Sequence, residues 1–156
     1  MAARVYDGRW TVRNQQEVVV LLIGMRVHRL RAPRRWLPPA RAMSAMLREL
    51  VTDPQGGLLS YRILPWWRTF TVVTYWRSHA HLQRYAHDEL HRATWLDYYR
   101  RENAGAAVGI WHETYAVPAA SYEAIYVNMP RLGLGRAKRL ARVGPDSDTA
   151  MARLHS

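Results

Sequence analysis

The sequence predicts a single domain of mixed α and β structure, in the order strand, helix, strand, strand, helix, strand. Three observations support this prediction. The first half of residues 18–30 is apolar and rich in β-branched side chains, and later segments carry apolar residues at helical spacing. The turn sequence of residues 53–57 separates the first helical segment from two further strand-like segments. The length of 156 residues, 49% of them hydrophobic, allows one core with short tails.

The first strand of this domain is expected over residues 18–30. Its first half is apolar on both faces, which is typical of a strand that is covered on both sides. In its second half Gly24, Arg26 and His28 fall on one face, while the other face stays apolar. A buried strand that becomes polar on one face often borders a pocket or a subunit interface.

Residues 33–51 are expected to form the first helix, with an irregular start. Pro38 and Pro39 interrupt the pattern, so the regular part is expected to begin there, where proline is tolerated in the first turn. The residues that follow form an apolar stripe at helical spacing: Ala42, Met43, Met46, Leu47 and Leu50.

Residues 58–64 and 69–76 are expected to form two strands joined by a tight connection at residues 65–68. Trp66 and Trp67 lie in this connection. Two exposed tryptophans at the tip of a hairpin would be unusual, so we expect them to pack against another surface, such as a second subunit.

Ser78 is expected to cap a second helix that extends to residue 85. Residues 88–103 either continue this helix or begin another one after a break. A strand over residues 107–117 follows and ends at Pro118. Residues 122–128 are expected to form a last short strand or arm.

The two ends of the chain are expected to lie outside the domain. Residues 1–16 are polar and are expected to be a loose arm, in which Trp10 and Val12 are candidates to start a short strand. Residues 17–130 form the predicted domain. Residues 131–156 are basic and lack an apolar period, so they are expected to be a disordered tail.

The predicted order of elements is that of a ferredoxin-like domain, in which the helices cover one face of the sheet. Because the strands are apolar on both faces, the face without helices needs a cover. A second copy that packs sheet against sheet is the simplest cover, so we expect a homodimer with twofold symmetry. The final segment is a candidate to reach across to the partner.

The composition excludes several classes of protein. The chain has no cysteine, which excludes disulfides, thiolate catalysis and zinc-ribbon sites. The longest apolar run, residues 18–23, is too short to span a bilayer, and residues 1–14 show no signal peptide, so a cytoplasmic protein without a membrane partner is expected. The net charge of +11 is spread over several segments, so nucleic acid is not an expected partner.

Six segments carry a resemblance to known proteins: residues 22–27, 46–50, 75–78, 84–88, 109–115 and 122–130. The last two are the most specific. Together they resemble the dimeric α/β-barrel superfamily, which includes antibiotic-biosynthesis monooxygenases, heme-degrading monooxygenases, chlorite-dismutase-like proteins and aldoxime dehydratases. They resemble more closely a bacterial family of unknown function whose members are called monooxygenase family proteins. The resemblance covers residues 18–135 and implies a dimeric α/β barrel and oxygen chemistry.

The resemblance also implies a heme site as one candidate. In the heme-degrading members an axial histidine lies on the helix that follows a strand-terminal tryptophan, and His91 after Trp76 matches this order. His91 is therefore the candidate ligand of heme b iron, with His87 as a second cofactor-binding candidate. The residues that are candidates to pair with the propionates are Arg26, Arg84 and Arg92.

Other readings of these histidines remain open. His91 can equally pack or cap within its helix, as it does in cofactor-free relatives. The asparagine that heme-degrading members carry on the first strand is not evident, and Arg26 or His28 stands near its place, which argues against heme degradation. His87 and His91 share a face of an unbroken helix, but no third ligand is placed for zinc, so zinc hydrolysis is not expected.

A cofactor-free oxygenase instead needs a base, a dry pocket and hydrogen-bond donors for a developing oxyanion. The candidate bases are His91, His112 and His28. The candidate substrate-binding residues are Arg26, Tyr75, Trp76, Trp111 and Asn128. His112 and Trp111 lie on opposite faces of one strand, and the alternation alone does not decide which face meets the cavity. A strand histidine is more often structural, and Asn128 can instead fix the turn before Pro130.

These observations predict a monooxygenase-like enzyme that acts on a small hydrophobic molecule in an aromatic-lined cavity between sheet and helices. The first alternative is a heme b enzyme, with His91 as axial ligand, that dehydrates aldoximes or carries out an oxidation. The second is a non-catalytic protein that binds a ligand or nucleic acid. Use of a flavin supplied by a partner reductase also stays open.

Overall fold

The computed structural model describes residues 3–13, 16–87, 89–102 and 107–155, without the side chains of residues 89–91, 94, 101 and 102. Its main sheet has four strands in the order β3-β4-β2-β5, and all neighbouring strands are antiparallel. The strands are β2 (Val18–Val27), β3 (Leu58–Trp66), β4 (Thr69–Trp76) and β5 (Val108–Val117). This order confirms the predicted ferredoxin-like fold.

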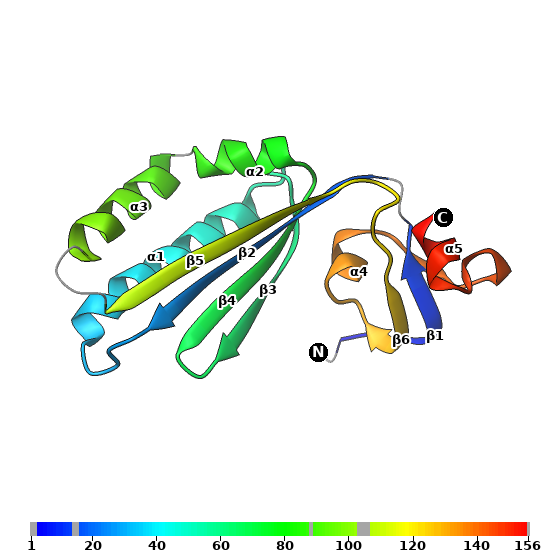
Figure 1. The fold of residues 1–156 in the computed structure, drawn as a ribbon, viewed down its shortest axis with the longest axis horizontal. Helices are drawn as coiled ribbons and strands as arrows, with labels where there is room; N and C mark the ends of the chain where they lie inside the picture. The colour runs from blue at the N-terminus through cyan, green and yellow to red at the C-terminus, as the bar shows by residue number, and fades with distance from the viewer. Residues whose placement is uncertain (1–2, 14–15, 88, 103–106, 156) are drawn as a thin grey trace.

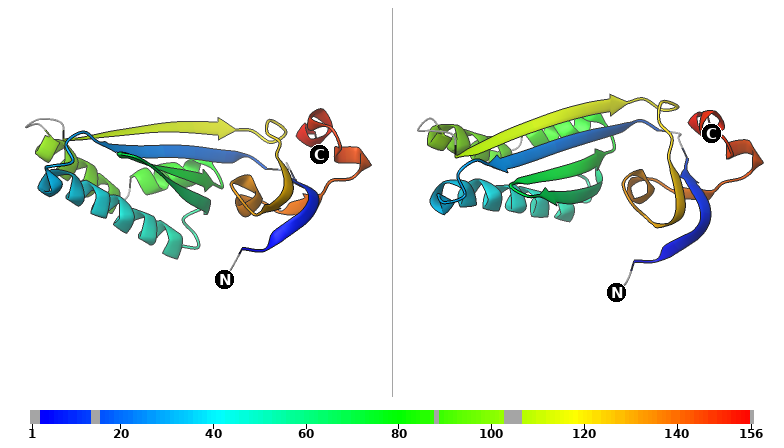
Figure 2. Two further views of the ribbon diagram at one scale, coloured as in Figure 1. Left: turned by 90° about the horizontal axis from the view of Figure 1, so that it is seen from below. Right: turned by 60° about the horizontal axis from the view of Figure 1, so that its bottom comes forward.

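Three helices cover one face of this sheet, as Figure 1 and Figure 2 show. They are α1 (Pro33–Thr52), α2 (His79–Ala86) and α3 (Glu89–Glu102). The alternation along β2 decides which residues meet them. Val19 and Met25 point toward the helices and are each 1% exposed, whereas Val20 and Leu22 lie on the other face and are only half-buried.

Helix α1 is longer and more regular than the sequence predicts. It begins at Pro33 and continues through Pro38 and Pro39, so the prediction that the prolines interrupt it is wrong. The first turns are held by packing, since the Trp36 side chain contacts the core cluster around Met25, and its indole Nε1 donates to the Leu30 carbonyl across 3.2 Å. Contacts of this kind offset the hydrogen bonds that the two prolines cannot donate.

The second helical segment is broken into two helices. Ser78 caps α2, as predicted, because its hydroxyl accepts a hydrogen bond from the backbone N–H of His81. α2 ends at Ala86, and His87 is its C-cap residue. α3 begins at Glu89 as a separate helix. The sequence left open whether this segment continues or breaks, and the structure has two helices, so the single continuous helix on which His87 and His91 would share a face is not present.

Both ends of the chain form part of a second, smaller sheet, which Figure 1 shows beside the main one. Its strand order is β6-β1-β7, with β1 (Val5–Val12), β6 (Ile125–Pro130) and β7 (Leu140–Arg142). The same region holds α4 (Leu134–Ala137), the 3-10 helix η1 (Pro145–Ser147) and α5 (Ala150–Leu154). The expectations of a loose arm before residue 17 and a disordered tail after residue 130 are therefore wrong for the described residues.

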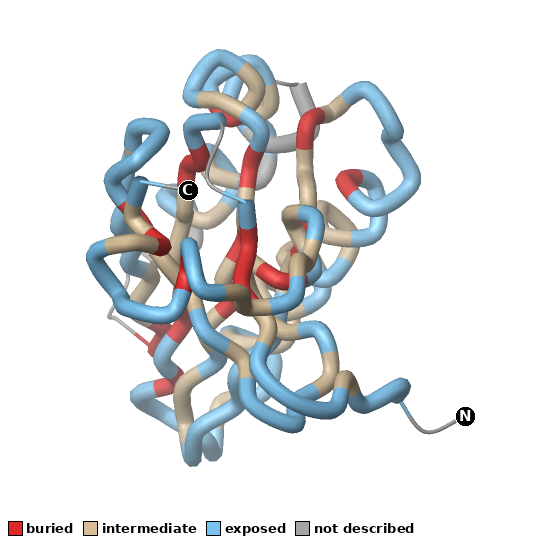
Figure 3. The backbone as a smooth tube through the Cα atoms, turned by 90° about the vertical axis from the view of Figure 1, so that its right-hand side faces the viewer, coloured by how far each residue is buried: buried red, intermediate tan, exposed pale blue. Residues whose placement is uncertain are grey.

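A small core of its own explains why these ends are ordered. Val12 and Val18 are each 1% exposed and pack with the buried Tyr122, and Leu134 and Leu140 cover them. The tail thus contributes apolar side chains that bury surface despite its basic composition. Figure 3 shows the buried segments of the backbone in red among half-buried and exposed ones. Helix α4 of the tail packs against β1, β3 and β4 of its own chain.

The hairpin between β3 and β4 ends in two strongly exposed tryptophans. Trp66 is 80% exposed and Trp67 is 87% exposed, and Trp67 has a φ of +50°, which is unusual for a bulky residue. Arg68 anchors the tip, since its Nε donates to the Val27 carbonyl across 3.0 Å. The described part of the chain gives the two indoles no cover.

The described residues also limit what the chain can hold or cross. None of the helices formed by them is long and apolar enough to cross a membrane. Nor do they contain a group of three or more histidines and carboxylates arranged to hold a metal ion.

Candidate functional site

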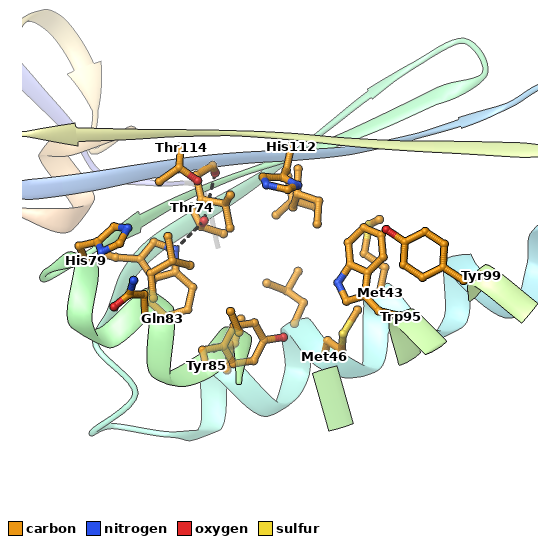
Figure 4. Close-up of a pocket in the computed structure, with 18 residues that line it drawn as sticks. Met43, Met46, Thr74, His79, Gln83, Tyr85, Trp95, Tyr99, His112 and Thr114 are labelled. Carbon is orange, nitrogen blue, oxygen red and sulfur yellow. Dashed lines mark hydrogen bonds between the residues drawn. The ribbon is translucent and has the colours of Figure 1, made fainter. Parts of the chain in front are cut away.

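A cavity of about 420 Å³ lies between the three helices and the sheet face that they cover. This volume is within the range of small-molecule sites. Figure 4 shows its walls, with the sheet on one side and the helices opposite. Most of the lining is apolar or aromatic, including Leu21, Ile23, Met43, Met46, Leu47, Leu50, Val72, Trp76, Leu82, Tyr85, Trp95 and Tyr99.

The strand pattern places the sheet side of this cavity. Val72, Thr74 and Trp76 alternate along β4 with residues of the other face, so all three point to the helices. Trp76 is fully buried, and its indole Nε1 donates to the Thr74 hydroxyl across 2.8 Å. The Tyr85 ring of α2 packs against the indole with centroids 5.6 Å apart. Trp76 is therefore a fixed wall of the cavity.

Most polar groups of the cavity come from two elements. His79 and Gln83 line it from α2, where they are four residues apart and share a helix face. His112 and Thr114 line it from β5, where alternation brings both side chains to the helix-covered face. Figure 4 shows the His112 imidazole directed into the cavity from the sheet, with Thr114 beside it.

His112 lines the cavity from β5, and its imidazole is directed into it. It pairs with Ile23 of β2 across the sheet, and Ile23 also lines the cavity. β5 is an edge strand of the sheet, and the His112 side chain remains exposed. An exposed imidazole that lines an apolar cavity can take a proton from a molecule in the cavity and exchange it with solvent.

The structure thus brings two of the predicted site residues, Trp76 and His112, to one cavity. The sequence did not decide whether His112 or Trp111 of β5 meets the cavity, and the structure shows that it is His112. His28 lies beyond the end of β2, beside Gly109, and is exposed. Arg26 is on the sheet face without helices, and its guanidinium donates to the Thr69 hydroxyl across 3.4 Å. Neither residue lines the cavity.

Three other predicted substrate-binding residues lie elsewhere. The Trp111 indole covers Gly24 on the face without helices, and it leaves no room for a Cβ there. Tyr75 is half-buried against Gly133, where burial raises the pKa of its phenol. Asn128 has a φ of +53°, and its Oδ1 accepts a hydrogen bond from the Gly8 N–H across 2.8 Å. Asn128 thus ties β6 to β1.

The described residues do not assemble the heme site that the resemblance implies. The Arg84 guanidinium donates to the Gln55 carbonyl across 3.1 Å, and Arg26 is on the opposite sheet face, so neither lines the cavity to meet a propionate. His87 is exposed at the end of α2. The side chain of His91 lies outside the described residues.

Sequence reasoning missed most of the helix side of the cavity. The missed residues that face it are Met43, Met46, His79, Gln83, Tyr85, Trp95 and Tyr99. A usable signal was present in α2, because His79, Leu82, Gln83 and Ala86 follow the i, i+3, i+4, i+7 spacing of one helix face. That signal identifies a buried face but does not distinguish a cavity wall from a filled core.

Comparisons with known proteins agree with this fold. The chain is 34% identical over 70 residues to the monooxygenase af470 of Aspergillus fumigatus, a match that covers 45% of this chain and 25% of the relative. Two aldoxime dehydratase structures, one of them with butyraldoxime, each superpose with a TM-score of 0.67. The identities are 20% and 19%, with 88% and 98% of this chain covered.

These matches have different weights. At 19–20% identity the likeness to the dehydratases shows a shared fold alone, and this chain spans less than half of each, 43% and 46%. The chain likewise matches only about a quarter of the length of its curated relative. A family model, Monooxygenase af470-like, matches residues 18–134, which include the whole main sheet, its three helices and every residue that lines the cavity. The chain therefore belongs to the Monooxygenase af470-like family.

Proposed function

We propose that this chain is a monooxygenase-like enzyme that oxidises a small hydrophobic molecule in the cavity, with His112 as general base. One observation carries the proposal: a single strand places an imidazole, with a threonine beside it, at a cavity that is otherwise mainly apolar and aromatic. The membership of the monooxygenase family supports the reaction class. The apolar lining supports the class of substrate.

The proposed chemistry starts with proton removal by His112. The substrate carries an activated methylene, and the neutral imidazole takes one of its protons to leave a stabilised carbanion. The carbanion gives one electron to O2, and the resulting radical pair combines to form a carbon–oxygen bond. The imidazolium returns the proton to the peroxide, and loss of the second C–H proton with hydroxide gives a ketone and water. One methylene and one O2 are thus consumed for each ketone and each water formed.

The other polar groups of the cavity are suited to hold the substrate. Thr114, His79 and Gln83 can donate hydrogen bonds to a carbonyl oxygen that becomes negatively charged when the carbanion forms. The apolar walls formed by Trp76 and Tyr85 limit the access of water, which strengthens these hydrogen bonds. These residues therefore position the substrate, while His112 moves the proton.

Oxygen consumption tests the proposal most directly. The probe is a polycyclic aryl ketone with an acidic methylene, such as anthrone, and the readouts are O2 uptake and incorporation of one 18O atom from labelled O2. We expect His112→Gln to lower the rate by about 10²- to 10⁴-fold, the usual contribution of a general base. His28→Gln is the matched control, because His28 lies outside the cavity, and it should leave the rate unchanged.

Two results would count against this function. Equal rates for the native protein and His112→Gln would show that His112 is not the general base. Uptake that requires added hemin, with a saturable and sharp Soret band lost in His91→Ala, would replace this proposal with the heme alternative. The native protein and His91→Ala are therefore both titrated with hemin in the same experiment.

We further propose that the sheet face without helices pairs with a second copy of the chain. Val20, Leu22 and Val73 are half-buried on this face, and Trp111 and Tyr115 are 37% and 51% exposed there. Large exposed apolar patches are typical of interaction sites, and most homo-oligomers pair equivalent faces. The exposed hairpin tip, with Trp66 and Trp67, is continuous with the same sheet.

The mass in solution tests this assembly. We expect light scattering to give twice the mass of one chain, and Leu22→Arg to give the mass of one chain. Leu30→Arg is the control, since Leu30 is an exposed apolar residue outside the sheet. A native protein with the mass of a single chain would contradict the proposed dimer.

A further inference from the structure

A second cavity, of about 240 Å³, lies beside the first between α1 and α3. Its own walls include Pro38, Pro39 and Ala42 of α1, Ala93 of α3 and Ile110 of β5. Four residues line both cavities: Ile23, Met43, Met46 and Trp95. The two spaces are therefore neighbours that share one wall.

The shared wall is made largely of adaptable side chains. Met43 and Met46 are unbranched and have three rotatable bonds each, so they can move aside at a lower cost than branched residues. Both are half-buried on the same stripe of α1, three residues apart. A molecule in the first cavity can thus extend into the second when these two side chains change rotamer.

The two cavities differ in polarity. His79, Gln83, Thr74, His112 and Thr114 all line the first cavity only. Among the described residues that line only the second, Asp97 has the one charged side chain and is exposed, and the Tyr98 hydroxyl donates to the Val108 carbonyl across 3.1 Å. The second cavity therefore suits an apolar group, and the first suits the polar end of the same molecule.

The strand geometry places the proposed base close to the junction. His112 lines the first cavity, and Ile110, two residues earlier on the same face of β5, lines the second. Two residues span about 7 Å along a strand. Ile23, which pairs with His112, lines both spaces. Figure 4 shows His112 between the His79 end and the Trp95 and Tyr99 end of the first cavity.

We propose that the substrate is an elongated molecule with a polar head near His79 and Gln83 and a linear aliphatic tail that passes Met43 and Met46 into the second cavity. This inference rests on the proposed function, because it takes the first cavity as the substrate site. It adds the class of substrate, a chain-bearing molecule whose reacting carbon lies near the junction.

Binding of a homologous series tests the inference without turnover. Neutral n-alkan-1-ols from butanol to decanol are titrated by calorimetry. In the native protein the affinity should rise by up to about fourfold for each added methylene, the gain expected for its complete burial. Ala42→Phe fills the second cavity only, so long alcohols should lose this gain while short ones bind unchanged. Ala93→Phe fills it from the opposite helix and should act in the same way.

Ala86→Phe is the matched control, since Ala86 lines the first cavity only and a larger residue there should weaken short and long alcohols alike. The inference is overturned if the native affinity stops rising at the chain length where Ala42→Phe stops, or if Ala42→Phe weakens all lengths equally. If the affinity for the alcohols rises with chain length but the protein takes up no O2, the proposed function is refuted while the two-cavity binding site is supported.

Discussion

The indole Nε1 of Trp76 donates a hydrogen bond to the Thr74 hydroxyl across 2.8 Å, and the same hydroxyl donates to the Leu21 carbonyl across 3.1 Å. Trp76 is 0% exposed and Thr74 is 3% exposed. One threonine therefore satisfies the only polar group of the buried tryptophan side chain and ties β4 to β2. The cavity wall depends on this small chain of hydrogen bonds.

Thr74→Val keeps the shape of the side chain but removes the hydroxyl. The Trp76 N–H is then buried without an acceptor, which should lower the free energy of unfolding by about 1–3 kcal/mol. Urea denaturation measures this loss. Thr74→Ser, which keeps the hydroxyl, should recover most of the hydrogen-bond contribution, and equal losses in the two variants would contradict this explanation.

Gly24 and Trp111 form a second close contact, on the sheet face without helices. A Cβ at residue 24 would lie 2.3 Å from the indole Nε1 of Trp111, which is too close for any real contact. Gly24→Ala should therefore displace the indole and cost about 1–3 kcal/mol of stability. Since Trp111→Ala removes the obstacle, the double variant should lose less than the sum of the two single variants. Additive losses, measured by urea denaturation, would contradict a direct clash.

The main sheet could be predicted from the sequence because its strands carry strong local signals. β2 and β4 are rich in apolar and β-branched residues. The ends of two strands are marked in the sequence as well, since Ser78 follows β4 and Pro118 follows β5. The alternation along β5 also separated His112 from Trp111 correctly. What alternation cannot supply is the position of the helices, and that position alone decides which of the two residues meets the cavity.

The sequence indicates two strands of the smaller sheet in part, at Trp10 and Val12 and over residues 122–128, which overlap β1 and β6. Their pairing into one sheet with the tail could not be predicted, because it depends on contacts between distant segments. β1 pairs with β6 and β7, which are more than 100 residues away in the sequence. Arginine side chains pack on the aromatic rings of β1. The Arg142 guanidinium lies 5.7 Å from the Trp10 ring centroid, and the Arg4 guanidinium lies 5.3 Å from the Tyr6 ring centroid. Such pairs look like a solvated surface in the sequence.

Ser78 holds the start of the helix that carries His79 and Gln83 into the cavity. Its hydroxyl accepts from the His81 N–H and also lies 2.7 Å from the His81 Nδ1. Ser78→Ala should therefore lower the free energy of unfolding by about 0.5–2 kcal/mol, the usual cost of losing an N-cap. Ser78→Asn, which can cap in the same way, should cost less. Thermal denaturation of the two variants checks this, and an Asn variant as unstable as the Ala variant would argue against a capping role.

The stability should fall at high pH because of a half-buried tyrosine in the smaller sheet, Tyr126. Burial raises the pKa of Tyr126 above its ordinary 10.0, although a hydrogen bond from the Gly135 N–H lowers it in part. The folded state thus holds this proton more tightly than the unfolded state. The stability that the protonated Tyr126 phenol contributes is fully present below pH 10, and it is lost as the pH rises from 10 through the raised pKa.

Tyr126→Phe tests this pH dependence. The variant should be less stable than the native protein at about pH 8, since the hydroxyl also donates to the Leu132 carbonyl across 2.9 Å, but its stability should fall less steeply above about pH 10. Lys138 has a lowered pKa from burial and contributes with the opposite sign near its unfolded value of 10.5. Because Lys138 is present in both proteins, the difference between their urea midpoints isolates Tyr126. Parallel curves would contradict the assignment.

Arg153 and Glu123 connect α5 to the segment before β6. The Arg153 side chain is 7% exposed, and its Nε donates to the Glu123 Oε2 across 2.7 Å, while its Nη1 donates to the Asp148 carbonyl across 2.9 Å. Glu123→Ala leaves a buried guanidinium without its carboxylate, which is far more costly than removing an exposed ion pair. Because the Glu123 side chain is 30% exposed, we expect a moderate loss of about 1–3 kcal/mol.

This loss should be local to the C-terminal segment, because α5 packs against η1 and lies beside the smaller sheet, away from the main sheet that holds the cavity (Figure 1). Hydrogen exchange should accelerate over residues 145–155 in Glu123→Ala and remain unchanged in β2 and β4. Glu123→Gln keeps an acceptor for the Arg153 Nε and should show a smaller effect. Unchanged exchange over residues 145–155 in Glu123→Ala would mean that the backbone carbonyls alone hold Arg153. Faster exchange across the main sheet would mean that the two parts of the chain unfold together.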